Sequence, residues 1–476
     1  MLSSAHFHNL PIQKEGMRKI FSRLFLFFAV FAAAHLYAAP ALQARDVQTR
    51  SIEDDSHIRR RLESEWFRES PVSVLARAPE IHTLRSGTRV QVRTETSAQN
   101  PHEFAVVLAR EQYGTFPGWA QGSWVLTRLR DTPLHYGSRI RIFLRSDFNT
   151  FVQFRPLGGG ERSQMDVVIY DAYMVRSLPI PIPFERLFVL PVENALSAAG
   201  TRFPRHYFDP DLGRYRDSRA FVNAVRSQLP QLRFADDGAI DENGNFVFIN
   251  GLAPQNSETQ GLNCSGFVKW IIDGILRPVT GRRLPIRPLA EPFGDRGGIS
   301  IEHWEQLRDP FFGLDWIRNL AANAGTVLRS PSFANLSEIE VRNWSFSQII
   351  SRRGGVRTVQ QYRGFLENAG FCIEGIRPLM YSLAINEPGW IYLAAVNDEW
   401  GAERFDGFDP TDLRGLPRLR QFFHVAVLVP FFDERGNFQV VVFESAAETS
   451  FQGFSTRYPG HFVSLVRVPI HDRFDP

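Results

Sequence analysis

Short hydrophobic runs separated by turn residues dominate the chain from about residue 73 to 195. The runs are rich in β-branched and aromatic side chains, and glycines such as Gly114 and Gly118 stand between them. This pattern predicts a β-rich domain, either a small barrel or a sandwich. The expected strands cover residues 88–94, 104–110, 123–128, 138–144, 165–173 and 186–192. Before them, residues 54–69 have the pattern of one amphipathic helix, with Ser56 as its candidate cap.

The pattern changes near residue 199, where helical and β-type periodicities mix. Helices are predicted over residues 217–229, 264–276, 301–307, 316–324, 337–352 and 359–369. Strands are predicted over residues 246–249, 390–396, 424–429, 438–443 and 461–468. The sequence therefore predicts an α+β domain over 199–476, preceded by a β-rich accessory domain over 45–198.

Residues 1–44 have the pattern of a secretory signal peptide. Arg18, Lys19 and Arg23 form a basic stretch, residues 24–36 form a short apolar core, and small residues suited to cleavage follow. The core is too short to span a bilayer comfortably, and an uncleaved anchor is the alternative. We expect an extracytoplasmic protein, periplasmic or secreted, of a bacterial envelope, which meets the membrane only if the leader stays uncleaved.

The distribution of charge argues against a nucleic-acid partner. The formal net charge is +3, but residues 1–44 carry four cations and one acidic residue, so the chain from residue 45 onward is neutral. Nearly all cations are arginines, and they are scattered along the chain rather than clustered. A neutral chain without a basic stripe lacks the electrostatic footprint that nucleic-acid binding requires.

The candidate nucleophile is Cys264, one of two cysteines in the chain. A polar loop precedes it and an apolar helical run follows it, so the thiol is expected in the first turn of a helix. Unpaired backbone amides and the helix dipole favour the thiolate at that position. The small residues Ser265 and Gly266 would let a substrate carbonyl approach. A structural thiol at a helix start is the alternative interpretation.

A thiolate nucleophile needs an imidazole beside it, and His424 opens an apolar strand that would hold one rigidly. His461 also begins a strand and is the main competitor, whereas His303 lies in a predicted helix. The strand after His424 ends at Glu444, which antiparallel pairing would bring close to His424. Glu444 is therefore the candidate for orienting the imidazole, with Ser445 as its substitute.

Three segments resemble, in order, motifs of the NlpC-type cell-wall cysteine peptidases, a family of the papain-like superfamily. They are Asn263-Cys-Ser-Gly-Phe-Val268, Glu387-Pro-Gly-Trp-Ile-Tyr-Leu393 and His424-Val-Ala-Val-Leu-Val429. The resemblance implies an α+β, papain-like cysteine peptidase core, a helix packed on an antiparallel sheet. It also implies Cys264 as nucleophile, His424 as base, Glu444 as orienting residue, and peptidoglycan or muropeptides as partners.

The chain departs from this family in three respects. Asn263 stands where the family usually has aspartate, and Phe246 or Phe248 where a tyrosine often assists the oxyanion site. A large insertion, about residues 277–386, separates the cysteine from the histidine, and it could form a lid, a substrate wall or a partner surface. The sequence thus predicts an exported cysteine hydrolase that cleaves amide bonds in peptidoglycan stem peptides. A catalytically weak or inactive envelope-binding protein on the same fold is the alternative.

The remaining motifs predict neither a metal nor another cofactor. The histidines are dispersed, no paired-cysteine motif occurs, and the acidic run 241–245 is interpreted as a hairpin turn. A Cys264–Cys372 disulfide in a structural protein is a further hypothesis, because export favours bridges. Trp119, Trp124 and Tyr136 could stack on glycans from the N-terminal domain, although core packing is the more usual role of such residues.

Overall fold

The computed structural model describes a chain of mixed helix and antiparallel sheet, an α+β protein at the coarse level. The described residues are 54–97, 100–131, 137–253, 260–294, 309–342, 344, 347–351, 357–361, 364–367, 369–398 and 421–476. The expected leader, His303 and Tyr136 lie outside them, as does the helix expected over 301–307. Within the described residues, no helix has the length and apolar character needed to cross a membrane.

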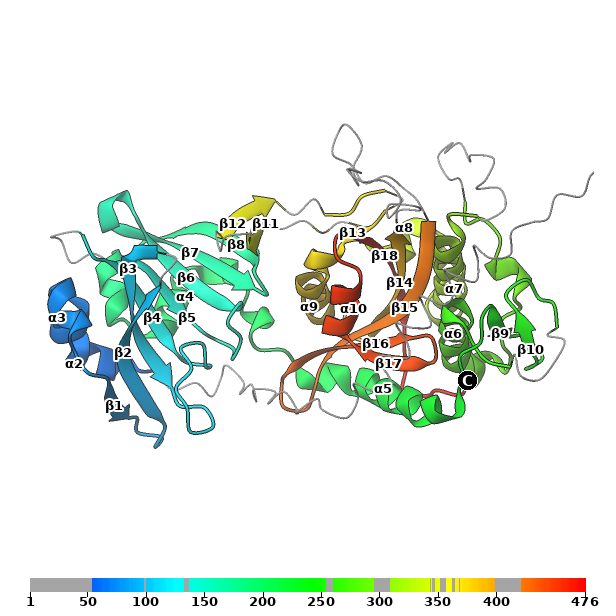
Figure 1. The fold of residues 1–476 in the computed structure, drawn as a ribbon, viewed down its shortest axis with the longest axis horizontal. Coiled ribbons are helices and arrows are strands. Elements are labelled where there is room, and N and C mark those ends of the chain that lie inside the picture. Colours follow the sequence, from blue (N-terminus) through cyan, green and yellow to red (C-terminus); the bar gives the residue numbers. More distant parts are fainter. Residues whose placement is uncertain are drawn as a thin grey trace, which may run out of the picture. The chain divides into compact units, whose positions relative to one another are not determined.

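The N-terminal part is one antiparallel sheet in which every strand pairs with its neighbour in the sequence (Figure 1). Its strands are β1 (Glu80–Thr83), β2 (Arg89–Ser97), β3 (Asn100–Arg110), β4 (Trp124–Leu129), β5 (Gly137–Ile142), β6 (Phe151–Leu157), β7 (Arg162–Ile169) and β8 (Ala172–Ile180). The predicted run 165–173 is divided by a tight turn at Tyr170 and Asp171, both with positive φ. This meander confirms the β-rich character of the region.

Two segments of the N-terminal part differ from the prediction. Residues 54–69 form helix α2 (Ser56–Leu62), which continues as a π-helical turn (Glu63–Phe67), and Asp55 rather than Ser56 is the N-cap residue. The strand predicted over 186–192 is wrong, because two short helices, η5 (Phe184–Phe188) and α4 (Val192–Ser197), occupy it. A proline precedes each helix, and proline cannot donate to a strand ladder.

Two buried arginines connect the first helical segment, residues 56–67, to η5 and to strand β4. Arg59 of α2 donates to the carbonyls of Phe188 and Leu190, at 3.0 and 2.7 Å. Arg128 of β4 donates to the carbonyl of Trp66 at 3.1 Å. Desolvation of a buried cation is costly, and these carbonyls, with the carboxylate of Asp54 at 3.1 Å from Arg59, compensate part of that cost.

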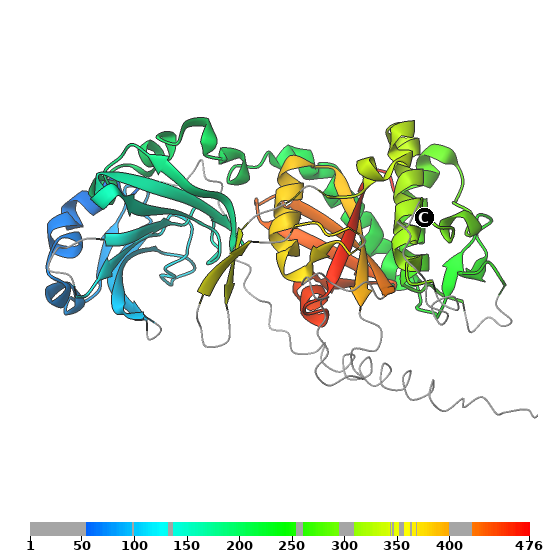
Figure 2. The same cartoon turned by 90° about the horizontal axis from the view of Figure 1, so that it is seen from above.

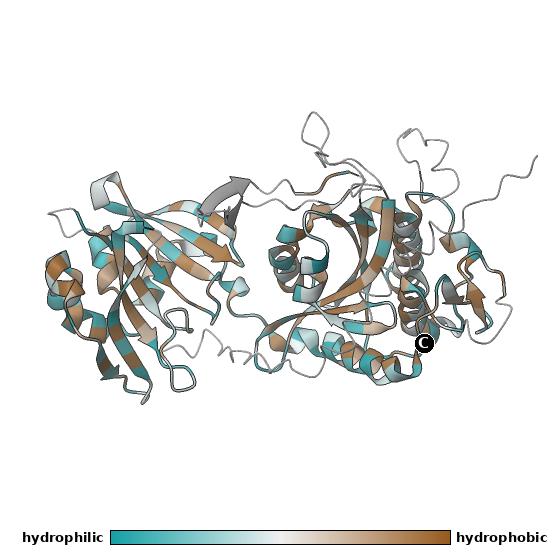
Figure 3. Ribbon diagram, in the orientation of Figure 1, coloured by the Kyte–Doolittle hydropathy of each residue, from teal (hydrophilic) through white to brown (hydrophobic). Residues whose placement is uncertain are grey.

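The C-terminal part is built on a second antiparallel sheet, with the strand order β13-β18-β14-β15-β16-β17. Its strands are β13 (Phe371–Cys372), β14 (Trp390–Asp398), β15 (Gln421–Phe432), β16 (Phe438–Glu444), β17 (Ala447–Ser450) and β18 (Phe462–Pro469). The strands predicted over 390–396, 424–429, 438–443 and 461–468 are confirmed. The central strands are drawn largely in hydrophobic colours in Figure 3, as expected for a sheet buried on both faces.

Helices cover both faces of this sheet (Figures 1 and 2). One face packs with α6 (Cys264–Thr280) and α7 (Phe312–Leu328) through side chains such as Val425 and Val427. The other face packs with α9 (Ile376–Asn386) and α10 (Phe451–Arg457) through Ala426 and Leu428. Successive residues of β15 thus enter different cores, which follows from the two-residue period of a strand. Helix α5 (Arg216–Gln228) confirms the helix predicted over 217–229.

The stretch 277–386, expected as an insertion, contributes directly to the core. Helices α7 and α9 belong to it, and their apolar residues are buried against the sheet. Between them, the helices predicted over 337–352 and 359–369 are wrong. Helix α8 (Leu336–Ile339) is one short turn, and strands β11 (Ser347–Ser351) and β12 (Arg357–Gln361) form a hairpin.

This hairpin extends the N-terminal sheet, because Ser347 and Gln348 of β11 pair with Tyr173 and Ala172 of β8. Sequence periodicity could not have revealed the pairing, since a short apolar run fits a helix or a strand equally well. The connection crosses the boundary predicted near residue 199.

Candidate active site

Helix α6 begins at Cys264, as predicted, and its first turn is closed by a side-chain cap. The side chain of Asn263 accepts a hydrogen bond of 2.7 Å from the backbone N–H of Gly266. An asparagine in this position satisfies one of the N–H groups that a helix start leaves without a helical partner. Asparagine can cap a helix as well as aspartate does, without adding a negative charge beside the thiol.

Glycines allow the chain to pass very close to the start of α6. A Cβ atom on Gly266 would lie 2.1 Å from the carbonyl oxygen of Gly238, and one on Gly238 would lie 2.3 Å from that of Gly261. Gly238 opens β9 (Gly238–Ile240), and its carbonyl accepts a hydrogen bond of 2.9 Å from the N–H of Asn263. The start of α6 therefore packs directly on the backbone of Gly238, and this contact fixes the position of Cys264.

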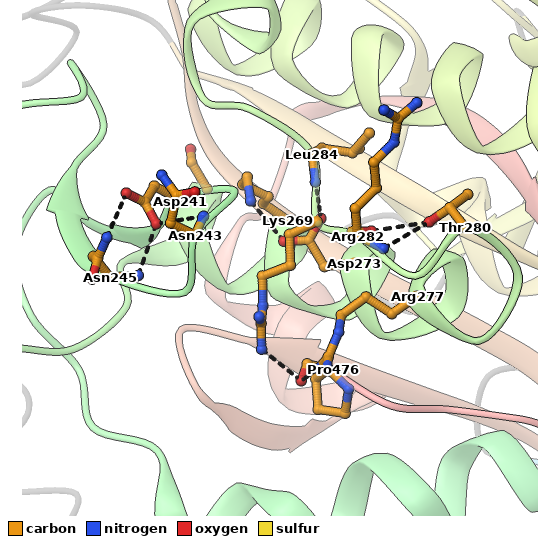
Figure 4. A network of polar contacts seen from close by, with 12 residues as sticks. Asp241, Asn243, Asn245, Lys269, Asp273, Arg277, Thr280, Arg282, Leu284 and Pro476 are labelled. Carbon is orange, nitrogen blue, oxygen red and sulfur yellow. Dashed lines mark hydrogen bonds and ion pairs between the residues drawn. The ribbon is translucent and has the colours of Figure 1, made fainter.

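The strand β9 and its partner β10 (Phe246–Phe248) form the hairpin expected around the acidic run. The carboxylate of Asp241 accepts hydrogen bonds from the backbone of Asn243 and Asn245 at 2.9 and 2.7 Å (Figure 4). The predicted hairpin turn is confirmed.

Further along α6, a buried ion pair anchors the helix (Figure 4). Lys269 Nζ lies 2.6 Å from Asp273 Oδ2, and both side chains are almost fully buried. The other oxygen of Asp273 accepts a hydrogen bond of 2.8 Å from the N–H of Leu284. Burial lowers the pKa of Lys269 and raises that of Asp273, while the attraction between the two opposes both shifts. The pair joins α6 to the chain that follows it.

His424 lies near the beginning of β15, beyond the part of that strand that β16 covers. The ladder between β15 and β16 starts at Val427 and Phe443, so residues 421–426 extend past it. Helix α6 contacts β15. The backbone of Val425 hydrogen-bonds to the sulfur of Cys264, which places the thiol beside the start of the strand.

Glu444 is the last residue of β16, and its carboxylate reaches the imidazole. Glu444 Oε2 lies 2.7 Å from His424 Nε2. The other oxygen, Oε1, accepts a hydrogen bond of 2.8 Å from Arg457 at the end of α10. The proximity expected from the antiparallel register is thus present. Arg457, which the sequence did not indicate, completes the set of partners around the carboxylate.

The thiol of Cys264 is hydrogen-bonded to His424, and each group shifts the pKa of the other. Burial alone would raise the pKa of Cys264, but the hydrogen bond and charge of His424 outweigh it, so the pKa is lowered. Burial alone would lower the pKa of His424, yet its hydrogen bonds to Cys264 and Glu444 raise that pKa to about 9. The arrangement favours a thiolate and an imidazolium near neutral pH.

Electrostatics keep Glu444 ionised although it is buried. Burial would raise the pKa of this carboxyl, but His424 and then Arg457 hold it below its ordinary value. Because Glu444 occupies Nε2 of the imidazole, Nδ1 is the nitrogen that remains for the sulfur. Cys264 and His424 stay partly exposed, whereas Glu444 is 4% exposed. Cys264 and His424 are therefore closer to solvent than Glu444 is.

The other sequence-predicted residues lie elsewhere or play other parts. Ser445 sits in the tight turn after Glu444, with a φ of 49°. The ring of His461 lies within an aromatic cluster beside His424 rather than replacing it. Trp124 is 1% exposed and belongs to the N-terminal core, so the glycan-stacking role suggested for it is wrong, whereas Trp119 is 36% exposed.

Neither cysteine forms a disulfide, so the Cys264–Cys372 bridge is ruled out. Cys372 donates a hydrogen bond of 2.6 Å to a carboxylate oxygen of Glu374. Burial, together with that carboxylate, raises the pKa of Cys372 to about 12. The two thiols therefore have opposite character, one favouring the thiolate and the other the thiol.

No group of three or more histidine, cysteine or acidic side chains within the described ranges is arranged to hold a metal ion. Three residues at the site escaped sequence analysis: Phe423, Arg457 and Tyr458. Phe423 directly precedes His424 in the sequence, and that position was its one signal. Arg457 and Tyr458 lie at the end of α10, which reaches Glu444 only through the fold.

Comparison with known proteins bears on the N-terminal part alone. A family model described as a domain of unknown function (DUF8515) matches residues 48–207. This stretch holds strands β1 to β8 and ends well before α6. No curated protein and no solved structure matches the chain. The assignment of a function therefore depends on the chemistry of the site.

Proposed function

We propose that this protein is an exported cysteine hydrolase that cleaves amide bonds, with Cys264 as nucleophile, His424 as acid and base, and Glu444 as the residue that orients the imidazole. One observation carries the proposal: the continuous chain of hydrogen bonds from Cys264 through His424 to Glu444. Thiol hydrolases use a partly exposed cysteine at a helix start, with a thiolate that an imidazolium stabilises.

The reaction follows from the positions of these groups. The thiolate of Cys264 attacks the carbonyl carbon, and the backbone N–H of Cys264, at the helix start, helps to stabilise the oxyanion. The C–N bond breaks as the imidazolium of His424 gives its proton to the departing amine, which leaves a thioester on Cys264. Neutral His424 then takes a proton from water, whose oxygen attacks the thioester. The thiolate departs, and the acid product is released.

The fold and the sequence motifs support a narrower version of the proposal. A helix that carries the cysteine and packs on an antiparallel sheet that carries the histidine agrees with a papain-like core. The motif resemblance to NlpC-type peptidases favours stem peptides of peptidoglycan as the source of the amide, and an extracytoplasmic location. The catalytically inactive binding protein remains the second candidate, because Phe246 and Phe248 offer no hydroxyl for the oxyanion.

Hydrolysis of purified cell-wall fragments tests the enzyme proposal. We expect the full chain to release new amino and carboxyl termini, detected by mass spectrometry, and the Cys264→Ala variant to release none. Cys372→Ala is the matched control and should retain the activity, because its thiol is held protonated beside Glu374. Full activity in the Cys264→Ala protein would refute the proposal.

Thiol alkylation separates the enzyme from the inactive binder. With limiting iodoacetamide at pH 7, we expect Cys264 to be modified at least about tenfold faster than Cys372, because the thiolate is the reacting form. The pKa of Cys264 is lowered and that of Cys372 is raised to about 12. Equal, slow labelling of the two cysteines would favour the binding protein.

A further inference from the structure

Beside the imidazole of His424 lies a cluster of aromatic rings that the proposed reaction does not use. The ring centroid of Phe423 is 5.7 Å from that of Tyr458 and 6.3 Å from that of His461. Tyr458 and His461 are 5.7 Å apart. We name Phe423, Tyr458 and His461 the ring cluster. The cluster adjoins His424, whose ring centroid lies 6.2 Å from that of Phe423 and 5.8 Å from that of Tyr458.

A β-bulge directs Phe423 into this cluster. Strand β14 pairs Val396 with His424 but Asn397 with Phe422, so Phe423 is an extra residue in β15. In a regular strand, consecutive side chains point to opposite faces, and Phe423 would leave the side of His424. The bulge instead lets both rings lie on the same side. Phe422 is buried in the core that contains α6 and α7, which confirms that the alternation breaks at Phe423.

The ring cluster contains one buried ring, Tyr458, and one ring that is partly exposed, Phe423. Tyr458 packs on buried Phe454 of α10, with ring centroids 5.5 Å apart, and is itself 9% exposed. Phe423 is 40% exposed, so part of its ring faces solvent although the ring has aromatic neighbours. The rings meet at steep angles, 74° between Phe423 and Tyr458 and 59° between Tyr458 and His461. Such angles are typical of edge-to-face contacts between aromatic rings.

We infer that the ring cluster is a substrate subsite that receives an apolar or aromatic side chain flanking the amide bond cleaved at Cys264. The inference rests on the proposed amide hydrolysis, but not on the cell wall as the source of the amide. A side chain seated there would be held next to His424, whose ring adjoins those of Phe423 and Tyr458. Burying the exposed face of Phe423 against an apolar group removes nonpolar surface from water on both partners.

The polarity of the surroundings favours an apolar group over a cation. The guanidinium of Arg457 adjoins Tyr458, with the centre of its charge 5.6 Å from the ring, and would repel a substrate ammonium. The acidic group nearby, Glu444, already pairs with His424 and Arg457. An apolar side chain does not depend on the charge of Arg457 or Glu444, and it can pack against the edges and faces of the aromatic rings.

Binding of small amides to the full-length Cys264→Ala protein tests the inference without any turnover. The probes are N-acetyl-phenylalaninamide and N-acetyl-glycinamide, compared by titration under NMR detection. We expect the phenylalanine probe to bind at least about tenfold more tightly, and Phe423→Ala in the same background to remove most of that difference. The Phe423→Leu variant, which keeps an apolar side chain, should retain part of it. Phe148→Ala, which removes an exposed ring of the N-terminal part, is the control and should leave the ratio unchanged.

The rate at which chloromethyl ketones inactivate the wild-type protein is a second test of the subsite. The rate with acetyl-phenylalanine chloromethyl ketone is divided by that with the glycine reagent, and iodoacetamide labelling is measured in parallel. Slow iodoacetamide labelling of Cys264 together with selective probe binding would defeat the hydrolase and keep the subsite. Rapid labelling without any effect of Phe423→Ala on the binding ratio would keep the hydrolase and overturn the subsite.

Discussion

Glu444 uses both of its carboxylate oxygens, and the two have different partners. Oε2 faces His424, whereas Oε1 faces Arg457, at 2.7 and 2.8 Å. A carboxylate held from both sides cannot rotate without losing one charged hydrogen bond. The imidazole is therefore oriented by a group that is itself fixed, which is the geometry that proton transfer requires.

The pH dependence of hydrolysis should show the contribution of Glu444. The active form contains a thiolate and an imidazolium, so activity falls at low pH as Cys264 gains a proton and at high pH as His424 loses one. The high-pH limb should lie at about pH 9, the pKa to which His424 is raised. The Glu444→Gln variant removes a charge that raises this pKa, so the limb should move toward 6.5, the ordinary value for histidine. We expect the rate near pH 7 to fall on the order of 100-fold.

Glu448→Gln is the matched control for this experiment, because Glu448 lies on the neighbouring strand β17 and pairs with Arg226 at the surface. It should leave both limbs in place. If Glu444→Gln keeps the wild-type profile, Glu444 does not orient the imidazole.

At the scale of elements, α6 depends on the buried pair that Lys269 and Asp273 form four residues apart. Lys269→Met would leave the carboxylate of Asp273 buried without its cation. We expect the free energy of unfolding, measured with urea, to fall by about 3–5 kcal/mol. Lys269→Met combined with Asp273→Asn should recover much of the loss, since asparagine can still accept from the N–H of Leu284.

A surface ion pair gives the comparison for that result. Arg226 of α5 and Glu448 of β17 lie 2.6 Å apart with both side chains partly exposed. Arg226→Met should therefore change stability by about 1 kcal/mol or less. A similar loss in Lys269→Met and Arg226→Met would show that burial of the α6 pair has no special weight.

The turn that follows Glu444 is strained. Ser445 and Ala446 connect β16 to β17 with φ values of 49° and 62°, and Glu444 pairs with Ala447 across the turn. Two positive φ angles define the hairpin turn that Asn-Gly adopts most readily. Ser445→Asn with Ala446→Gly should raise the free energy of unfolding by about 1 kcal/mol, measured with urea, because L-residues pay for this conformation. A loss of stability would show that the native side chains compensate the strain.

The sequence predicted best those elements that a continuous apolar run or a local change from polar to apolar residues defines. Strands β14, β15, β16 and β18 are continuous apolar runs, and α6 begins at the polar-to-apolar junction around Cys264. The hairpin β11–β12 was mistaken for helices because its state depends on pairing with β8, far away in sequence. Helix α9 was missed within the same mixed stretch. Pairing partners of that kind leave no periodic signal.

The same distinction holds for the candidate site. Cys264, His424 and Glu444 could be proposed because each begins or ends a predicted element, and antiparallel order relates the last two. Arg457 reaches the carboxylate only because α10 folds back over the sheet, and Phe423 faces the site only because of the bulge. Neither event is encoded in local hydrophobic pattern.

At the scale of the whole molecule, a hairpin from the stretch between the cysteine and the histidine completes the sheet of the N-terminal part. The Gln348→Pro variant removes a backbone N–H from the strand that pairs with β8 and should loosen the hairpin. We expect cleavage within residues 347–361 during limited proteolysis to become about tenfold faster. Gln348→Thr keeps the N–H and should be cleaved at the wild-type rate. Equal rates for all three proteins would contradict a structural role for this pairing.

The buried position of Lys269 has a practical consequence. Three lysines occur in the chain, and the other two, Lys14 and Lys19, belong to the expected leader. After removal of the leader, the folded protein would offer amine-directed reagents its α-amino group alone, since Lys269 is 0% exposed. A fluorophore ester would then label one defined end of the molecule. Modification of the Lys269 side chain would report the opening of α6, and therefore of the helix that carries the nucleophile.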